Sequence, residues 1–347
     1  MTASSAARPL HVLVTGGGGF IGGGIARALA AAGHSVRSFS RGEHPGLAER
    51  GIEPIRGDVA DAAAVLVAAE GCDIVFHAAA RAGVWGKRRD YERSNVLGTE
   101  NVIAACRALR IPRLVFTSSP SVTFDGRDQE GVDESAPYAE RFLADYPRTK
   151  AAAERLVRAA ASESLATVSL RPHLVWGPGD PHFFPRLVER ARSKRLALIG
   201  SRECRVDSTF IDNAVEAHLA AAQRLAPGSP ISGKAYFISN GEPLPLGILL
   251  GKLLFAAGLP PIRKRVPVKL AYGLAAIGEG IHRTIRRRSE PKLTRFTVRQ
   301  FSTAHWFDIG AARRELGWTP RVSIDEGIVM LKASLAERPR TAAPARG

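Results

Sequence analysis

The stretch LHVLVTGGGGFIGGG, residues 10–24, carries the strongest indication of the fold. Its first residues form an apolar run that predicts a buried parallel strand, and four glycines, Gly16 to Gly19, follow that run. The apolar, alanine-rich sequence from Phe20 to Ala32 predicts a helix. Strand, glycine turn and helix together predict the first unit of a dinucleotide-binding domain, because glycine lets the backbone approach a diphosphate and the helix N-terminus offers it free N–H groups.

Two glycine spacings can be read in this turn. Gly16, Gly19 and Gly22 are three residues apart, whereas Gly17, Gly19 and Gly22 match the pattern G-x-G-x-x-G. The alternative is a flexible turn in an unrelated α/β protein. The contacts expected here for a dinucleotide are Gly16, Gly17, Gly19, Phe20, Ile21 and Gly22.

Strands and helices then alternate along the chain, which predicts a doubly wound parallel sheet. The expected strands are 35–39, 52–58, 72–77, 113–116 and 167–171, and the expected helices are 60–69, 95–107 and 151–161. Residues 125–140 are expected to form a loop. The predicted organisation is a flexible N-terminus (1–9), a Rossmann domain for NADP (10–175 with parts of 205–240), a smaller substrate-binding and lid region (176–335) and a disordered tail (336–347).

Composition excludes several classes of protein. The chain has 347 residues and three widely spaced cysteines, so we expect no disulfide framework and a reducing, cytoplasmic location. The first residues, MTASSAAR, lack an apolar segment, so no signal peptide is predicted. No apolar run is long enough to cross a membrane. The nine histidines contain no H-x-x-x-H pair, and no metal site is predicted.

The net charge of +16 is partly local. Residues 262–299 hold eleven Lys and Arg against Glu279 and Glu290, a local charge of +9. This charge fits an acidic substrate, an acidic partner protein or an anionic membrane surface. No nucleic-acid-binding motif accompanies it, so nucleic acid is not an expected partner.

The residues after the second strand indicate the type of dinucleotide. Ser40 and Arg41 stand where NAD-binding domains place an acidic residue on the ribose, and a guanidinium suits the 2′-phosphate of NADPH. The alternative is a solvated arginine. Asp58 and Val59 are expected at the adenine ring; alternatively, Asp58 caps the helix at 60–69. The small residues Ala78, Ala79 and Ala80 end the fourth strand and would let a cofactor lie against it.

Candidate catalytic residues follow the fifth strand. Tyr146 and Lys150 are four residues apart and so share a helix face, where a lysine ammonium would lower the pKa of the phenol. The tyrosine could then give or take a proton, while Lys150 binds ribose hydroxyls. Ser119, favoured over Ser118 and Ser121, would hold the substrate oxygen. Alone, a Tyr-x-x-x-Lys pair is more typical of a surface; its position after strand five, a serine cluster and a nucleotide loop favours catalysis.

Other aromatic and apolar residues leave alternatives open. His77 is expected to be a satisfied core residue or to lie beside the cofactor, and Trp85 and Trp176 either line a substrate pocket or pack in the core. Between Pro267 and Ile285 an apolar stripe recurs at helical spacing, with basic residues crowding its end. Its members are Leu270, Leu274, Ile277, Ile281 and Ile285, and the basic residues are His282, Arg283 and Arg286 to Arg288. The stripe either faces the core or forms a lid whose basic rim meets an acidic protein or anionic lipid.

Several motifs resemble the extended short-chain dehydrogenase/reductases: the glycine loop from Thr15 to Gly22, Asp58-Val59, Thr117-Ser-Ser119, Tyr146-x-x-x-Lys150 and Arg171-Pro172. The segments 116–122 and 206–215 are closer to the 3β-hydroxysteroid dehydrogenase branch. Within it, 79–86, 175–180 and 236–245 are similar to the bacterial 2-alkyl-3-ketoalkanoate reductases of long-chain olefin biosynthesis. The resemblance covers about residues 10–335. It implies catalytic roles for Ser119, Tyr146 and Lys150, cofactor contacts at Thr117 and Pro172, and a homodimer formed through helices of the sheet domain.

The function expected from this resemblance is NADPH-dependent reduction of the 3-keto group of a long-chain 2-alkyl-3-ketoalkanoic acid to the 3-hydroxy acid. The alternatives are a 3β-hydroxysteroid or sterol dehydrogenase, a nucleotide-sugar epimerase or reductase, and a non-catalytic dinucleotide sensor. The enzyme is expected in the cytoplasm, in a multi-enzyme assembly or peripherally on a membrane.

Overall fold

A computed structural model describes residues 8–200, 203–285 and 291–337. Its centre is a seven-stranded sheet in the order β12-β7-β5-β4-β1-β2-β3, in which every pair of neighbours is parallel. The strands are β1 (His11–Thr15), β2 (Ser35–Ser40), β3 (Ile52–Arg56), β4 (Ile74–His77), β5 (Arg113–Thr117), β7 (Ala166–Pro172) and β12 (Lys234–Ile238). The predicted doubly wound sheet is confirmed.

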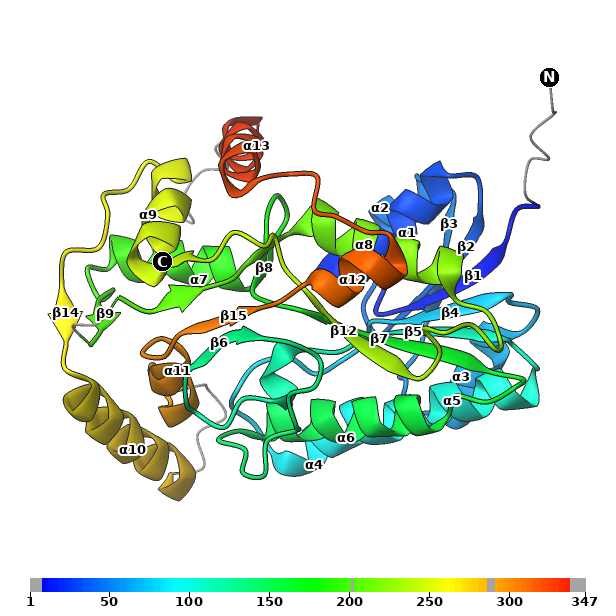
Figure 1. Ribbon diagram of the computed structural model, residues 1–347, viewed down its shortest axis with the longest axis horizontal. Coiled ribbons are helices and arrows are strands. Elements are labelled where there is room, and N and C mark those ends of the chain that lie inside the picture. The colour runs from blue at the N-terminus through cyan, green and yellow to red at the C-terminus, as the bar shows by residue number, and fades with distance from the viewer. Residues whose placement is uncertain (1–7, 201–202, 286–290, 338–347) are drawn as a thin grey trace, which may run out of the picture.

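Helices cover both faces of this sheet (Figure 1). One face carries α1 (Phe20–Ala31) and α8 (Ile211–Arg224), and the other carries α3 (Ala62–Ala69), α5 (Gly98–Ala108) and α6 (Asp145–Ala159). Alternate residues of β1 therefore enter different cores: Val12 and Val14 pack on the α1 side and Leu13 on the α3 side. Burial on both faces explains why β1 reads as a nearly continuous apolar run.

The C-terminal half builds a smaller region beside the carboxyl ends of the strands (Figure 1). Its helices are α7 (Phe183–Arg192), α9 (Leu246–Ala256), α10 (Val268–Thr284), α11 (Arg295–Gln300) and α13 (Ile324–Glu337), whereas α12 (Gly310–Leu316) packs against α8 and β12 of the sheet domain. A second sheet joins β13 (Leu244–Pro245), β10 (Arg205–Val206), β15 (His305–Phe307) and β6 (Gln129–Val132) in that order. There are also two separate two-stranded sheets: β8 (Val175–Trp176) pairs with β11 (Thr209–Phe210), and β9 (Leu198–Ile199) pairs with β14 (Arg265–Val266).

Several element ends differ from those expected by one or two residues, and three segments differ by more. The segment 125–140 is not all loop, because β6 pairs with β15, which lies far along the chain. The helix expected at 95–107 begins at Arg88, as α4 (Arg88–Tyr91) and a π-helical turn (Glu92–Leu97) before α5. The helix expected at 151–161 begins at Asp145, since Pro147 lies in the first turn, where proline costs no hydrogen bond.

The ends of the chain are described only in part. Arg8 pairs with Asp73 at 2.6 Å, while residues 1–7 of the predicted flexible N-terminus lie outside the described residues. Helix α13 continues through Glu337, so the tail expected from residue 336 begins inside a helix; residues 338–347 lie outside the described residues. Within the described ranges, no helix has the length and apolarity to cross a membrane.

Candidate active site

The glycine turn after β1 is built around two close approaches. Gly16 adopts φ +72°, and a Cβ there would lie 2.7 Å from the backbone nitrogen of Ala79. A Cβ on Gly22 would lie 2.3 Å from the carbonyl oxygen of Gly16. Gly19 precedes α1 as its N-cap and donates its N–H to the same carbonyl at 2.8 Å. The glycines spaced three apart therefore make the close backbone contacts of the turn, and Gly17 is also confined to glycine, because a Cβ there would lie 2.3 Å from the Ser38 hydroxyl oxygen.

The start of α1 suits a diphosphate. No side chain caps this helix end, and its first turn contains no acidic residue, so its N–H groups and positive dipole end are left for an anion. Gly16 to Gly19 carry no side chains of their own, and the His44 ring lies against Gly18. The residues present therefore fit the dinucleotide that the sequence predicts.

A cavity of about 300 Å³ extends from this turn across the ends of β2, β3 and β4. It gathers residues from five sequence segments. Those predicted from sequence are Gly16, Gly19, Ser40, Arg41, Asp58, Val59, Ala78, Ala79 and Ala80, and those that sequence reasoning missed are Gly18, Phe39, Gly42, His44, Gly57 and Ser94. The predicted contacts Gly17, Phe20, Ile21, Gly22, Thr117, Tyr146, Lys150 and Pro172 are not among its lining residues. The role of the gathered residues as cofactor contacts stays a prediction.

Asp58 is not the cap of the following helix. Asp61 caps α3, since its carboxylate accepts from the N–H groups of Ala63 and Ala64 at 3.1 and 3.2 Å. The carboxylate of Asp58 accepts from the N–H of Ala60 at 3.0 Å and pairs with Arg93 at 3.3 Å. Partial burial raises the pKa of Asp58, but these donors outweigh it and hold that pKa below its ordinary value. The alternative that Asp58 caps the helix is wrong.

His77 is a satisfied core residue beside the cavity. Its Nδ1 lies 2.7 Å from the hydroxyl of Thr15, and its Nε2 lies 2.9 Å from the hydroxyl of Thr99. Burial, with a contribution from the Lys150 charge, lowers the pKa of His77 to about 3, so the ring is neutral. His77 thus ties the ends of β1 and β4 to α5.

Among the residues that the structure describes, no group of three His, Cys, Asp or Glu side chains could hold a metal ion.

Ser119 and Tyr146 meet at the end of β5. Ser119 interacts with the Tyr146 hydroxyl, and the Ser119 hydroxyl lies 2.9 Å from that of Ser121. Burial raises the pKa of Tyr146, and the hydrogen bond from Ser119 opposes this rise. The expected lowering of this pKa by Lys150 is not found, because the lysine makes its contacts elsewhere. At neutral pH Tyr146 is therefore a neutral phenol that can donate its proton.

Lys150 is buried below the same strand end. Its Nζ donates to the carbonyl oxygen of Thr117 at 2.6 Å and lies 4.0 Å from the centre of the Phe116 ring. Burial lowers the pKa of Lys150 to about 7, while Glu154, one helical turn on, opposes this. The amine is thus held by the backbone of β5. The hydroxyl of Thr117 makes a separate contact, 2.9 Å from Nε2 of His218.

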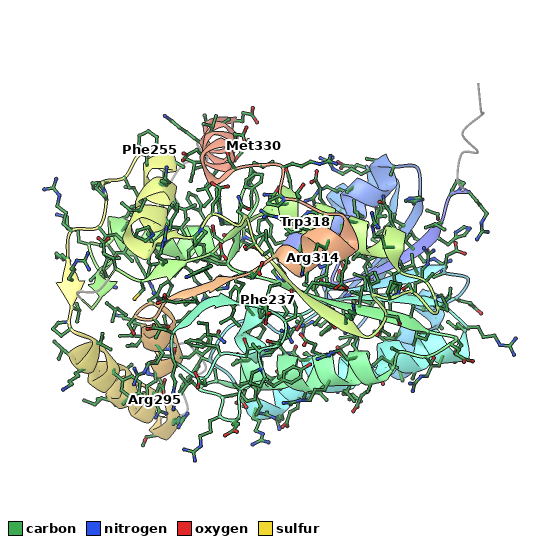
Figure 2. The ribbon with its side chains drawn as sticks, viewed as in Figure 1. Phe237, Phe255, Arg295, Arg314, Trp318 and Met330 are labelled. Atoms are coloured by element: carbon green, nitrogen blue, oxygen red, sulfur yellow. The ribbon has the colours of Figure 1, made fainter. Side chains whose placement is uncertain are left out.

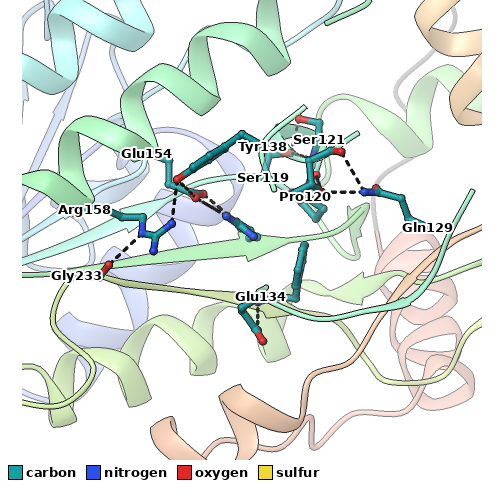
Figure 3. A network of polar contacts seen from close by, with 12 residues as sticks. Ser119, Pro120, Ser121, Gln129, Glu134, Tyr138, Glu154, Arg158 and Gly233 are labelled. Carbon is teal, nitrogen blue, oxygen red and sulfur yellow. Dashed lines mark hydrogen bonds and ion pairs between the residues drawn. The ribbon is translucent and has the colours of Figure 1, made fainter. Parts of the chain in front are cut away.

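A buried ionic network supports the inner face of α6 (Figure 3). Glu154 pairs with Arg171 at 2.6 Å and accepts from the Tyr138 hydroxyl at 2.8 Å. Arg158 donates to the Gly233 carbonyl and to Tyr138, which joins α6 to the residue before β12. Although burial opposes the charged form of Glu154, its bonds with Arg171 hold its pKa below the ordinary value. The network fixes the helix that carries Tyr146 and Lys150.

Asn95 is a positioning residue that sequence reasoning missed. It lies almost fully buried in the π-helical turn, and its amide donates to the Thr149 hydroxyl at 2.9 Å. Its oxygen accepts from the N–H of Arg81 at 2.7 Å. Asn95 therefore joins the loop after β4 to α6 between Tyr146 and Lys150. A π-helical turn is a frequent signal of a functional site, but it is not visible in the sequence.

A larger cavity of about 810 Å³ lies mainly within the C-terminal half. Apolar residues of α7, α9 and α10 and of the chain around β9 form most of its wall, α11 adds Thr297 and Gln300, and Gly83 and Val84 reach it from the N-terminal half. The basic residues on its wall are Arg186, Arg190, Arg195 and Lys292, accompanied by Glu189. An apolar wall with several cations fits a long-chain acid.

The two tryptophans singled out by the sequence have different surroundings. Trp176 is fully buried, bonds the Ser208 hydroxyl at 3.1 Å and packs edge-on against Phe210, so it is a core residue. Trp85 lies in the loop that reaches the larger cavity, and its ring is 6.0 Å from that of His282 at the end of α10. Trp85 thus links this loop to α10.

Comparison with known proteins identifies the family. Residues 13–263 match the 3-beta hydroxysteroid dehydrogenase/isomerase family. The 2-alkyl-3-oxoalkanoate reductase of Stenotrophomonas maltophilia is 52% identical over 330 residues, which cover 94% of this chain and 100% of that protein. The 2-alkyl-3-oxoalkanoate reductase of Shewanella oneidensis is 48% identical over 338 residues, covering 95% and 87%.

A solved structure agrees with the fold. UDP-glucose 4-epimerase of Thermus thermophilus, in complex with NAD, superposes with a TM-score of 0.72 at 25% identity, covering 94% of this chain and 99% of that one. With a family match over most of the chain and relatives near half identity, the chain belongs to the 3-beta hydroxysteroid dehydrogenase/isomerase family of extended short-chain dehydrogenase/reductases.

Proposed function

We propose that the protein reduces the 3-keto group of a long-chain 2-alkyl-3-ketoalkanoic acid to the 3-hydroxy acid with NADPH. The observation that carries this proposal is the pairing of Ser119 with a protonated Tyr146 at the strand ends. The names of the two bacterial relatives support the keto-acid class. The apolar cavity with basic residues on its wall supports a substrate with alkyl chains and a carboxylate.

The chain's own groups account for the proton that the reduction needs. When bound, the reduced nicotinamide supplies a hydride to the carbonyl carbon. Tyr146 donates its phenolic proton to the carbonyl oxygen, and Ser119 hydrogen-bonds the same oxygen. Lys150, fixed on the Thr117 carbonyl, offers donors for ribose hydroxyls. His77, neutral and bonded at both nitrogens, holds the strand ends without taking part in proton transfer.

The proposal also covers the choice of NADPH over NADH and the pathway in which the enzyme acts. Arg41 lies on the wall of the smaller cavity, next to Ser40 and in place of an acidic residue. A guanidinium there favours a 2′-phosphate by charge and by paired hydrogen bonds. A place in long-chain olefin biosynthesis, with the hydroxy acid as product, is proposed from the motif resemblance at residues 79–86, 175–180 and 236–245.

Two rival reactions share this site. The matched family supports a 3β-hydroxysteroid or sterol dehydrogenase, and the epimerase likeness supports a nucleotide-sugar substrate. Purified protein should be assayed for NADPH oxidation with a long-chain 2-alkyl-3-keto acid, a 3-ketosteroid and a UDP-4-keto-sugar. We expect the keto acid to give the highest kcat/KM. A higher value for either other substrate would overturn the substrate assignment.

Tyr146→Phe separates catalysis from binding in the same assay. The phenyl ring keeps the packing but lacks the acidic proton, so we expect the reduction rate to fall at least about 100-fold, with NADPH still bound. Fluorescence titration with NADPH measures the binding. Turnover near the wild-type rate would remove Tyr146 from the mechanism, and lost NADPH binding would show a structural effect instead.

A further inference from the structure

Helix α10 turns its bulky apolar residues toward solvent. Leu270, Leu274, Ile277, Ile281 and Ile285, which recur at helical spacing, are each 53% to 62% exposed. The face that is buried carries Ala271, Ala275 and Glu279. The alternative that this stripe faces the core is therefore wrong. An apolar row of this length in contact with water is unusual for a face that has no partner.

The orientation of α10 is fixed by α11, which packs against it (Figure 1). The buried carboxylate of Glu279 accepts from the N–H of Arg295 at 2.7 Å and from its side chain at 2.9 Å. Ala271 and Ala275 pack against Val298 of α11. Since small residues allow a close approach and the ion pair fixes the rotation, the row of Leu and Ile residues is held outward.

Positive charge surrounds this apolar row. Exposed basic residues precede α10 at Arg263, Lys264 and Arg265 and stand on it at Lys269 and Arg283. In the described part of residues 262–299, the one acidic residue is Glu279, which is buried in its pair with Arg295. Arg286, Arg287 and Arg288, counted in the predicted basic rim, lie outside the described residues. Although Glu203 pairs with Arg265 at 3.8 Å, the exposed charged side chains of this segment are otherwise cationic, which favours an anionic partner.

The apolar row is continuous with the larger cavity. Leu274 belongs to the row and also lines the cavity, together with Ala271. At the other end of the helix, the guanidinium of Arg283 lies 5.7 Å from the centre of the Trp85 ring, whose loop neighbour Val84 also lines the cavity. A lipid-like molecule could pass from the surface at α10 into the cavity along an apolar path.

We propose that α10 docks the protein on an anionic lipid bilayer. The apolar row enters the boundary between headgroups and acyl chains, and the basic residues contact lipid phosphates. A bilayer matches a long apolar row with a cationic border better than an acidic protein would, because only lipid offers both an apolar interior and a diffuse negative surface. Delivery of substrate from the bilayer rests on the proposed function, whereas docking itself does not.

Vesicle flotation of the full chain tests docking without any substrate. We expect binding to vesicles that contain phosphatidylglycerol, little binding to phosphatidylcholine alone, and weaker binding as salt rises. Ile277→Ser with Ile281→Ser should weaken binding at least about tenfold, since each exposed side chain loses its transfer into lipid. Unchanged binding by this double variant, or equal binding of wild type to both vesicles, would overturn the proposal.

The matched control lies on the other side of the molecule. Val329 and Met330 of α13 are also exposed, and Figure 2 places Met330 far from Arg295, which marks the α10 side. Val329→Ser with Met330→Ser removes comparable apolar surface and should leave vesicle binding unchanged. An equal loss in this control would show that binding follows general surface apolarity and would overturn the assignment to α10.

A charge-reversal pair provides a second variant that leaves the apolar row intact. Lys269→Glu with Arg283→Glu should abolish the preference for phosphatidylglycerol.

Light scattering tests whether a second copy of the chain covers the apolar row instead. A wild-type oligomer that dissociates in the Ile277→Ser and Ile281→Ser variant would assign the row to an interface between chains and overturn lipid docking. Soluble keto-acid reduction is measured separately, so failure of the proposed activity leaves the vesicle result interpretable.

Discussion

At Tyr146 and Lys150, burial sets the protonation states. The pKa of Tyr146 is raised, so the phenol keeps its proton at neutral pH, which suits a donor in ketone reduction. The pKa of Lys150 is lowered to about 7, so its charge changes in the neutral range. The sequence pattern predicted the pair but not these directions. They follow from the depth of both groups and from the Thr117 carbonyl that holds the lysine.

Arg41 is the residue that should decide the choice of dinucleotide. It is exposed at the wall of the smaller cavity, so a substitution there should not disturb packing. We expect Arg41→Asp to raise the KM for NADPH and to shift the ratio of kcat/KM toward NADH by about tenfold or more, because a carboxylate repels a 2′-phosphate. Steady-state kinetics with both cofactors measures this ratio.

Arg56 provides the matched control for Arg41. It is a nearby arginine at the end of β3, outside the lining of the cavity, and pairs with Glu43 at 3.2 Å on the surface. Arg56→Asp should leave the cofactor ratio near the wild-type value. If Arg41→Asp also left it unchanged, Arg41 would be a solvated residue and the preference for NADPH would lose its support.

At the scale of elements, α10 separates the wall of the cavity from the outer surface. Leu274 lines the larger cavity and is also exposed, so Leu274→Asp puts a charge on the apolar wall. We expect kcat/KM for a long-chain keto acid to fall several-fold more than that for a short-chain analogue, because only the long chain contacts this wall. Kinetics in vesicle-free buffer with both chain lengths checks this.

Ile281 tests whether the effect belongs to the wall. It lies two turns further along the same exposed row and is not among the residues that line the cavity. Ile281→Asp should therefore leave the ratio of long-chain to short-chain kcat/KM as it is in the wild type. Equal discrimination by the wild type and by Leu274→Asp would show that the substrate chain does not reach α10.

Over the whole molecule, the parallel sheet brings the reacting groups to one edge. Thr15, His77 and Thr117 end β1, β4 and β5, and each joins a hydrogen bond that crosses to another element. Because all strands run the same way, their carboxyl ends share this edge, where ligands of doubly wound sheets bind. His77, His173, His218 and Asp207 are buried titratable groups. The free energy of unfolding should therefore depend on pH.

Stability should fall as the solution becomes acidic. Burial holds the pKa of His77 at about 3, that of His218 at about 4 and that of His173 well below 6.5. Below pH 6.5 the unfolded chain binds protons that the folded chain does not, which costs roughly 2 kcal/mol at pH 5 for His77 and for His218. Asp207, whose pKa burial raises to about 6, opposes this by roughly 1 kcal/mol.

The free energy of unfolding should therefore be lower at pH 5 than at pH 7. Urea titrations at the two pH values, followed by circular dichroism, measure it. His218→Gln removes one of these groups and should reduce the difference between the two pH values, although it also loses the bond to Thr117. Equal stability at pH 5 and pH 7 would mean that these histidines are protonated in the folded chain.

Local sequence was enough to predict the sheet domain and nine of the fifteen residues that line the smaller cavity. Strand β1, the glycine turn and α1 depend on neighbours in the chain: an apolar run, a backbone that only glycine can adopt and a helical period lie within a few residues of each other. The resemblance to the family was confirmed for the same reason, since its motifs are short and contiguous. Residues that line the smaller cavity could be named because parallel strands end at one edge.

Other features depend on contacts between distant residues and became visible only in the folded chain. Strand β6 has little apolar pattern and exists through its pairing with β15, which lies far later in the sequence. Asn95 became a positioning residue only when a π-helical turn aimed it at Thr149. Glu279 and Arg295 set the outward direction of the α10 row, because helical period fixes which residues share a face, whereas the partner of the opposite face fixes where that face points.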